Sequence, residues 1–115
     1  MTLHDAQALH VKLVAKLIAF TYSAGFTLSW GEAYRTPQQA EWDAEHHTGI
    51  ADSVHCDRLA VDLMLFKDGV YLSDAASYKF MGDYWKSLDP TCRWGGDFKP
   101  LIDGDHFSLQ WQGRS

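Results

Sequence analysis

The sequence has few of the features that mark secreted, membrane or nucleic-acid-binding proteins. Its 115 residues contain two cysteines, too few for a disulfide framework, and we expect Cys56 and Cys92 to be reduced thiols. No group of lysines or arginines exceeds two neighbours and the net charge is −5, which argues against a nucleic-acid partner. Lys12 and Lys16 interrupt the apolar N-terminal stretch. We therefore expect no signal peptide, no membrane insertion and synthesis in the cytoplasm.

Apolar and aromatic residues are abundant. Hydrophobic residues make up 46% of the chain, with five Trp, five Tyr and six Phe, which excludes a disordered protein. The length fits one domain with one core, and no linker or repeat divides it. We therefore predict that residues 1–115 form a single domain.

Apolar spacing and capping signals predict three helices, at about residues 5–22, 37–45 and 74–88. Thr36 can cap the second helix, with Gln39 closing a capping box, and a polar loop is expected at 46–52. His4 and His10 fall on the polar side of the first helix and are expected to be solvated. Strands are expected at 26–30, 58–66, 70–72 and 106–111, and 93–98 should be irregular. This order predicts an α+β domain, a small antiparallel sheet with helices on one side.

Asp62 is the strongest indication of chemistry, because it lies inside an otherwise apolar strand. A buried carboxylate is costly unless it is paired or bound to a metal. An ion pair is one explanation, with three candidate partners: Arg35, Arg58 and Arg93. The other explanation is a metal site with His55 and His106, since catalytic zinc takes about three nitrogen or oxygen ligands and keeps one position open.

Two aspartates near His106 could take a proton from a water molecule beside such a metal. Asp103 lies three residues before His106, and Gly104 should give the backbone freedom to turn between them. Asp105 adjoins His106 and should point away from it, so it is the second choice. Cys56 should point away from His55 for the same reason. Arg35 could stabilise a developing oxyanion, or form an ordinary ion pair.

Three segments resemble the signature segments of the M15 peptidases, the D-alanyl-D-alanine carboxypeptidase/VanY-type metallopeptidases. They are residues 34–39 (YRTPQQ), Ser53-Val54-His55 followed by Asp62, and residues 103–107 (DGDHF). The resemblance covers about residues 30–111, in the family's order. The compact size and residues 58–63 are most similar to phage endolysins of the L-alanyl-D-glutamate peptidase subgroup. In one departure, Arg58 stands where the family pattern usually has glycine, which could reshape the loop beside the metal. In another, Asp103 replaces a glutamate and shortens the base by one methylene.

The resemblance implies a Hedgehog/DD-peptidase-type zinc fold with one Zn²⁺ per chain. It assigns the zinc ligands to His55, Asp62 and His106. It makes Asp103 the general base and Arg35 the contact to substrate and transition state. It places Ser53 and Gln39 in supporting or substrate-binding roles.

The implied function is hydrolysis of the L-alanyl-D-glutamate bond in bacterial peptidoglycan stems by a monomeric phage endolysin. Such an enzyme would be made in the host cytoplasm and reach the wall after holin-type release. Two alternatives remain open: a D-alanyl-D-alanine carboxypeptidase or dipeptidase, and a non-catalytic binding module that keeps the zinc fold.

Overall fold

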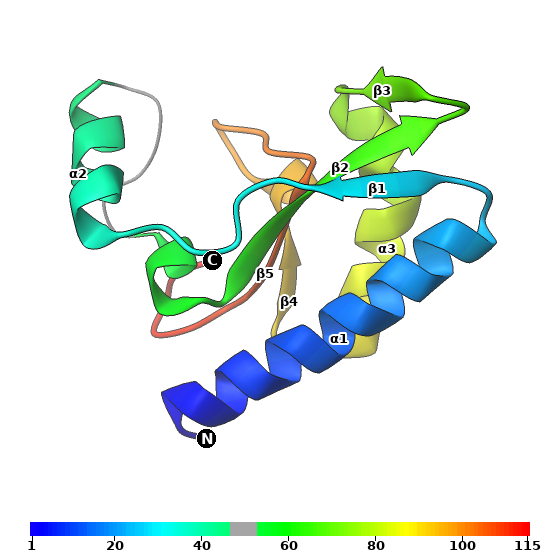
Figure 1. Cartoon of the computed structure of the whole chain (residues 1–115). Helices are drawn as coiled ribbons and strands as arrows, with labels where there is room; N and C mark the ends of the chain where they lie inside the picture. The colour runs from blue at the N-terminus through cyan, green and yellow to red at the C-terminus, as the bar shows by residue number, and fades with distance from the viewer. Residues whose placement is uncertain (47–52) are drawn as a thin grey trace.

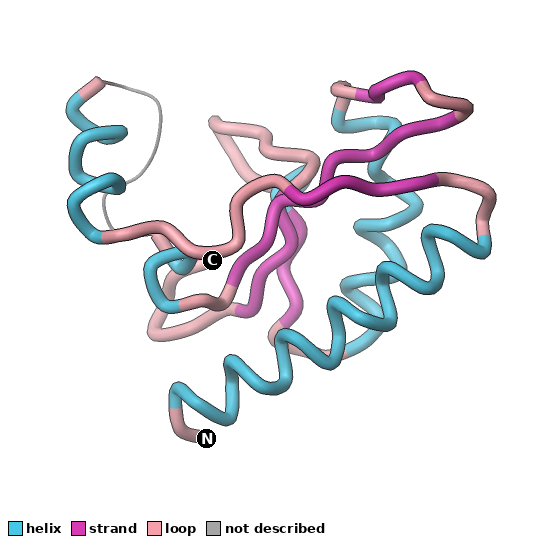
Figure 2. The backbone as a smooth tube through the Cα atoms, in the orientation of Figure 1, coloured by secondary structure: helices cyan, strands magenta, loops and turns pink. Residues whose placement is uncertain are grey.

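The computed structural model describes residues 1–46 and 53–115, which form an α+β fold (Figures 1 and 2). The helices are α1 (Leu3–Ser23), α2 (Pro37–Glu45) and α3 (Lys79–Leu88), with 3-10 helices η1 (Val54–Asp57), η2 (Ala75–Tyr78) and η3 (Gly95–Asp97). The strands are β1 (Thr27–Trp30), β2 (Ala60–Lys67), β3 (Val70–Leu72), β4 (Cys92–Trp94) and β5 (His106–Leu109). The predicted fold class is therefore confirmed. Residues 47–52 of the expected polar loop lie outside the described residues.

The sheet is antiparallel, with strand order β1-β2-β5-β4 and β3 paired to β2 as a hairpin. The hairpin turn uses Asp68 and Gly69, both at positive φ, as a two-residue turn of type I′ requires. The long strand β2 pairs with β1 along its second half and with β5 along its first half. It is therefore the strand that links the two parts of the sheet.

The core lies between one face of the sheet and the helices α1 and α3, which cover the same side (Figure 1). Strand β2 contributes Val61, Leu63 and Leu65 to this face, as its alternating sequence predicts. Trp85 of α3 is fully buried, and its indole N–H lies within hydrogen-bonding distance of carbonyls in β4 and β5. None of the described helices combines the length and apolarity that a membrane span requires.

Local structure differs from the sequence prediction at several points. Residues 92–94 form a strand, β4, where an irregular segment was expected. The predicted third helix begins as the 3-10 helix η2 and becomes α-helical only at Lys79. Thr36 caps α2 as predicted, but the capping box stays open, because the Gln39 amide donates to Asp43 instead of turning back.

His10 is buried, whereas the sequence analysis placed it in solvent; the exposure predicted for His4 is confirmed. His10 lies four residues after Ala6 and three before Leu13, on the buried stripe of α1. Its Nε2 lies 3.1 Å from the Phe107 carbonyl, and its ring meets Trp85 edge-on. Burial lowers the pKa of His10 to about 4 from an ordinary 6.5, so the folded protein keeps this ring neutral.

We predict that His10 makes folding sensitive to acid. The unfolded chain binds a proton near pH 6.5 and the folded chain only near pH 4, so stability is complete above pH 6.5 and falls between those values. The loss amounts to about 3 kcal/mol for this group. A His10→Gln variant cannot titrate but can still donate to the Phe107 carbonyl. Urea unfolding between pH 8 and pH 4 should give a flatter profile for the variant; parallel profiles would contradict the assignment.

Candidate metal centre

Strand pairing brings two of the predicted ligands together. In the register of β2 with β5, Asp62 lies directly opposite His106. Side chains of such a pair project from the same face with their Cβ atoms about 5 Å apart. Asp62 Oδ1 is 3.6 Å from His106 Nδ1. This face is the one opposite Val61 and Leu63, so the site lies on the side of the sheet away from the main core.

The third predicted ligand, His55, comes from η1, which leads into β2. Ser53 caps η1 by accepting a hydrogen bond from the His55 N–H, and Arg58 ends it in the left-handed conformation, with φ 58°. His55 is thereby turned toward Asp62, with Nε2 3.3 Å from Asp62 Oδ1. His55, Asp62 and His106 can each present one ligand atom so that all three lie within 4.8 Å of one another. The structure therefore assembles the predicted ligand set.

Asp62 itself supports the fit of a metal ion. Its Oδ1 is buried and is the single buried side-chain oxygen or nitrogen without a hydrogen-bond partner among the described residues. Burial alone would raise the pKa of Asp62, but the neighbouring His106 and His55 lower it to about 2, so the carboxylate is ionised. An ionised oxygen without a hydrogen bond is costly in a protein interior. A cation held between this oxygen and the two imidazoles would satisfy it.

The outer contacts of the two histidines use one ring nitrogen each and leave the other nitrogen facing Asp62. His106 Nε2 lies 2.8 Å from the Ser115 carbonyl, and His55 Nδ1 lies 3.4 Å from the Ala33 carbonyl. Because a carbonyl can only accept, each of these nitrogens carries the hydrogen. A metal ion would bind at the other nitrogen of each ring, His55 Nε2 and His106 Nδ1, and these are the two atoms that face Asp62. Ligating histidines in metal sites are commonly oriented this way.

The loop before β5 places two carboxylates beside this cluster. Asp103 Oδ2 lies 3.8 Å from His106 Nδ1, and the side chain is 51% exposed. The Asp103 N–H donates to the Gly95 carbonyl at 2.9 Å, and a Cβ on Gly95 would lie 1.9 Å from the Asp103 carbonyl oxygen. Gly104 is not at positive φ; it is needed because a Cβ there would meet the Ala75 backbone at 2.8 Å. Close packing, rather than turn flexibility, explains this glycine.

The orientation of Asp105 differs from the prediction that it points away from the site. Its carboxylate lies within 4.8 Å of those of Asp62 and Asp103. The reason is that Asp105 belongs to the turn and not to the strand, so strand alternation does not apply to it. Burial, together with the hydrogen bond and charge of Asp103, raises the pKa of Asp105 to about 7. Both aspartates therefore border the cluster.

Arg35 forms its shortest ion pair with Glu32 and not with Asp62. Its Nε and Nη2 lie 2.7 Å and 2.5 Å from Glu32 Oε1. The same oxygen is 3.7 Å from His55 Nδ1, so Glu32 links the arginine to the metal-site histidine. Burial alone would lower the pKa of Arg35, but Glu32 raises it, with smaller effects from Asp43 and Asp62. Glu32 is a site residue that the sequence does not single out; its spacing of three residues from Arg35 is the available signal.

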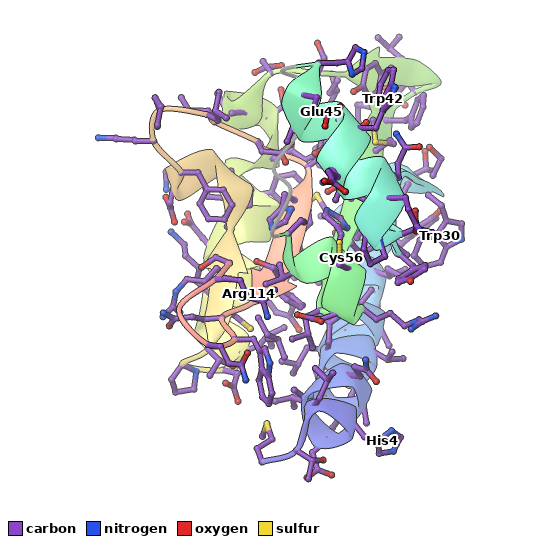
Figure 3. The ribbon with its side chains drawn as sticks, turned by 90° about the vertical axis from the view of Figure 1, so that its left-hand side faces the viewer. His4, Trp30, Trp42, Glu45, Cys56 and Arg114 are labelled. Atoms are coloured by element: carbon purple, nitrogen blue, oxygen red, sulfur yellow. The ribbon has the colours of Figure 1, made fainter. Side chains whose placement is uncertain are left out.

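The remaining predicted residues have definite places. Arg58 adopts the left-handed conformation that glycine favours, and its guanidinium lies 4.0 Å from the Tyr34 ring centroid. Cys56 and Cys92 are free thiols, as predicted. Cys56 lies in η1 rather than in an extended segment (Figure 3). It belongs to neither of the two metal-type groups found among the described residues. Gln39 is exposed and bonded to Asp43.

Comparisons with known proteins identify the family and support the fold. A family model described as D-alanyl-D-alanine carboxypeptidase, of the M15 peptidases, matches residues 46–109. The fold is similar to the crystal structure of the Serratia marcescens L-Ala D-Glu endopeptidase ChiX, with a TM-score of 0.69 and 23% identity. That match covers 86% of this chain and 78% of the other. A search of curated proteins found no match. Because the family model covers more than half of the sequence, the chain belongs to the M15 metallopeptidase family.

Proposed function

We propose that this protein is a zinc-dependent peptidase that cleaves the L-alanyl-D-glutamate bond in the peptide stems of bacterial peptidoglycan. The observation that carries the proposal is the cluster of His55, Asp62 and His106, in which a buried, ionised Asp62 oxygen has no hydrogen-bond partner. Two histidines and a carboxylate form a ligand set typical of catalytic zinc. Such a set leaves a coordination position open, which a purely structural site does not need.

The three ligands would hold one zinc ion per chain, which when bound lowers the pKa of a water molecule and polarises the substrate carbonyl. His55 and His106 are pre-oriented by the Ala33 and Ser115 carbonyls, so binding does not require either ring to turn. Asp62 provides the negative charge that makes the site selective for a cation over a neutral occupant.

Asp103 is the proposed general base. It is half exposed, so water and substrate can reach it, and it lies beside His106 at the edge of the cluster. Its carboxylate can accept a proton from the attacking water and deliver it to the amine that leaves. Its backbone is fixed against Gly95, which compensates for a side chain shorter than the glutamate of the family pattern. Asp105, more buried and next to Asp103, is the alternative base.

Arg35 is the proposed contact for the substrate carboxylate or the developing oxyanion. Glu32 holds its guanidinium on the side of His55, and the Arg35 N–H lies 3.3 Å from the His55 carbonyl. Directly after Arg35, a surface pocket of about 390 Å³ is lined by Thr36, Gln38, Gln39 and Trp42. We propose that this pocket receives part of the peptide stem, with Gln39 as a polar contact. Ser53 supports the site by capping η1.

The choice of bond rests on two resemblances. The compact sequence is similar to phage L-alanyl-D-glutamate peptidases, and the similar solved structure is described as an L-Ala D-Glu endopeptidase. The matching family model, described as D-alanyl-D-alanine carboxypeptidase, favours the second candidate, release of terminal D-alanine. The complete set of ligands, base and arginine argues against a non-catalytic module. We further propose that the protein acts as a monomer in phage-induced lysis and reaches the wall after holin-type release.

We predict that the purified protein digests peptidoglycan and leaves new L-alanine and D-glutamate ends, as read by mass spectrometry of the fragments. Chelator should abolish the reaction and zinc should restore it. Asp103→Asn should lower kcat by about 100- to 10,000-fold while zinc remains bound. Asp105→Asn is the matched control and should retain most of the activity.

Three outcomes would contradict parts of the proposal separately. Release of D-alanine alone would show that the enzyme is a carboxypeptidase and not an endopeptidase. Full activity of Asp103→Asn together with an inactive Asp105→Asn would show that Asp105, and not Asp103, is the general base. Activity that persists without metal would reject the zinc mechanism.

We also predict that Glu32 stabilises the metal-free fold, because it accepts a hydrogen bond from Nε of a largely buried guanidinium and forms an ion pair with its Nη2. Glu32→Ala should lower the free energy of unfolding by about 1.5–3 kcal/mol. The control is Asp83→Ala, which removes an exposed ion pair with Lys79 on α3 and should cost less than about 1 kcal/mol. Urea unfolding with chelator present measures both, and equal losses would show that the Glu32 pair acts as an ordinary surface pair.

A further inference from the structure

The C-terminal turn, residues 111–115, folds back onto the face of the sheet that carries the metal-site residues. Trp111 and Arg114 exchange backbone hydrogen bonds at 2.9 Å in both directions. Between them Gln112 and Gly113 have φ angles of 49° and 76°, so a tight turn of the hairpin type reverses the chain. Ser115 is thereby carried back alongside β5.

The Ser115 carbonyl accepts two hydrogen bonds from β5. His106 Nε2 donates at 2.8 Å and the Ser108 hydroxyl donates at 2.7 Å. Ser108 is completely buried and His106 nearly so. The ring of His106 is therefore held at its outer nitrogen by a carbonyl that a second, buried donor keeps in place.

The residue before Ser115 connects the same turn to the other histidine. Arg114 Nη2 lies 2.5 Å from Asp57 Oδ2, and both side chains are mostly buried. Asp57 is the last residue of η1, two residues after His55, and its carbonyl accepts a hydrogen bond from Gln7 at 2.8 Å. Figure 3 shows Arg114 on the same face of the molecule as Cys56 of η1. Two neighbouring residues thus contact the elements that carry both histidines.

We propose that the C-terminal turn is a positioning segment that sets the two metal-site histidines before the metal binds. The Ser115 carbonyl fixes the hydrogen of His106 on Nε2, and the Arg114–Asp57 pair holds η1 against the turn. This inference rests on the proposed zinc ligands. Without the turn, the His106 ring can carry its hydrogen on either nitrogen or rotate, and zinc binding must then fix it.

The test compares zinc binding and ring state in four proteins: the wild type, a chain lacking Arg114 and Ser115, Arg114→Gln, and Lys79→Gln. The last is the matched control, since it removes an exposed ion pair on α3, away from the site. Zinc affinity is measured by competition with a chromophoric chelator. Nitrogen-15 NMR of the metal-free proteins at pH 8 reports which ring nitrogen of His106 carries the hydrogen.

We expect the shortened chain to bind zinc at least about 10-fold more weakly and to show a mixture of His106 tautomers. Arg114→Gln should retain the wild-type tautomer, because the Ser115 carbonyl remains, but bind zinc more weakly than Lys79→Gln. Should the shortened chain fail to fold, Ser108→Ala takes its place, since it removes the second donor to the same carbonyl.

The inference is overturned if the shortened chain keeps wild-type zinc affinity and the single tautomer, or if Ser108→Ala in its place keeps wild-type zinc affinity. It is also overturned if Lys79→Gln loses as much affinity as the turn variants, because general destabilisation would then explain the effect. A wild-type protein that binds no zinc would instead reject the proposed function.

Discussion

The pairing of β2 with β5 is the interaction on which the candidate site depends. With Asp62 opposite His106, one ladder position fixes the spacing of a carboxylate and an imidazole without any contribution from loops. A shift of this register by one residue would turn Asp62 toward the core and Val61 toward the site. The apolar residues on the other face of β2, buried under α1 and α3, prevent that shift. Core packing and site geometry are therefore set by the same strand.

In the metal-free protein the site contains an energetically unfavourable buried charge. An ionised carboxylate oxygen is buried between two imidazoles, without a hydrogen bond from any described residue. The two imidazoles are held facing that oxygen by contacts on their outer sides. These contacts come from Glu32, the Ala33 and Ser115 carbonyls and the Arg114–Asp57 pair. Residues that are far apart in the sequence thus contribute to one site. Pre-organisation of this kind lowers the cost of ordering the ligands when a cation binds.

The sequence predicted those parts of the molecule that follow from local periodicity. Alternation along β2 separated Asp62 from Val61 and Leu63, and capping residues set the start of α2. The predictions that the structure contradicts concern residues whose surroundings are set by tertiary contacts. His10 is buried because α1 crosses Phe107 and Trp85, and Gly104 is required by the approach of Ala75. Neither neighbour can be inferred from sequence spacing.

The candidate metal ligands could be named from the sequence because a polar residue in an apolar strand is costly and two histidines were available. The supporting residues could not. Glu32 acts through a side chain that reaches both Arg35 and His55, and Ser115 acts through its backbone, so its side chain carries no signal. The alternation of side chains along a strand predicts that Asp105 points away from His106, but Asp105 lies in a turn, where this alternation does not apply. Arg58 keeps a backbone conformation that glycine favours.

X-ray absorption at the zinc edge of the zinc-loaded protein tests the central claim most directly. The account predicts a first shell of nitrogen and oxygen atoms at about 2.0–2.1 Å, with outer-shell scattering from two imidazoles. A sulfur neighbour at about 2.3 Å, which Cys56 would supply, or fewer than two imidazoles, would contradict the assignment of His55, Asp62 and His106.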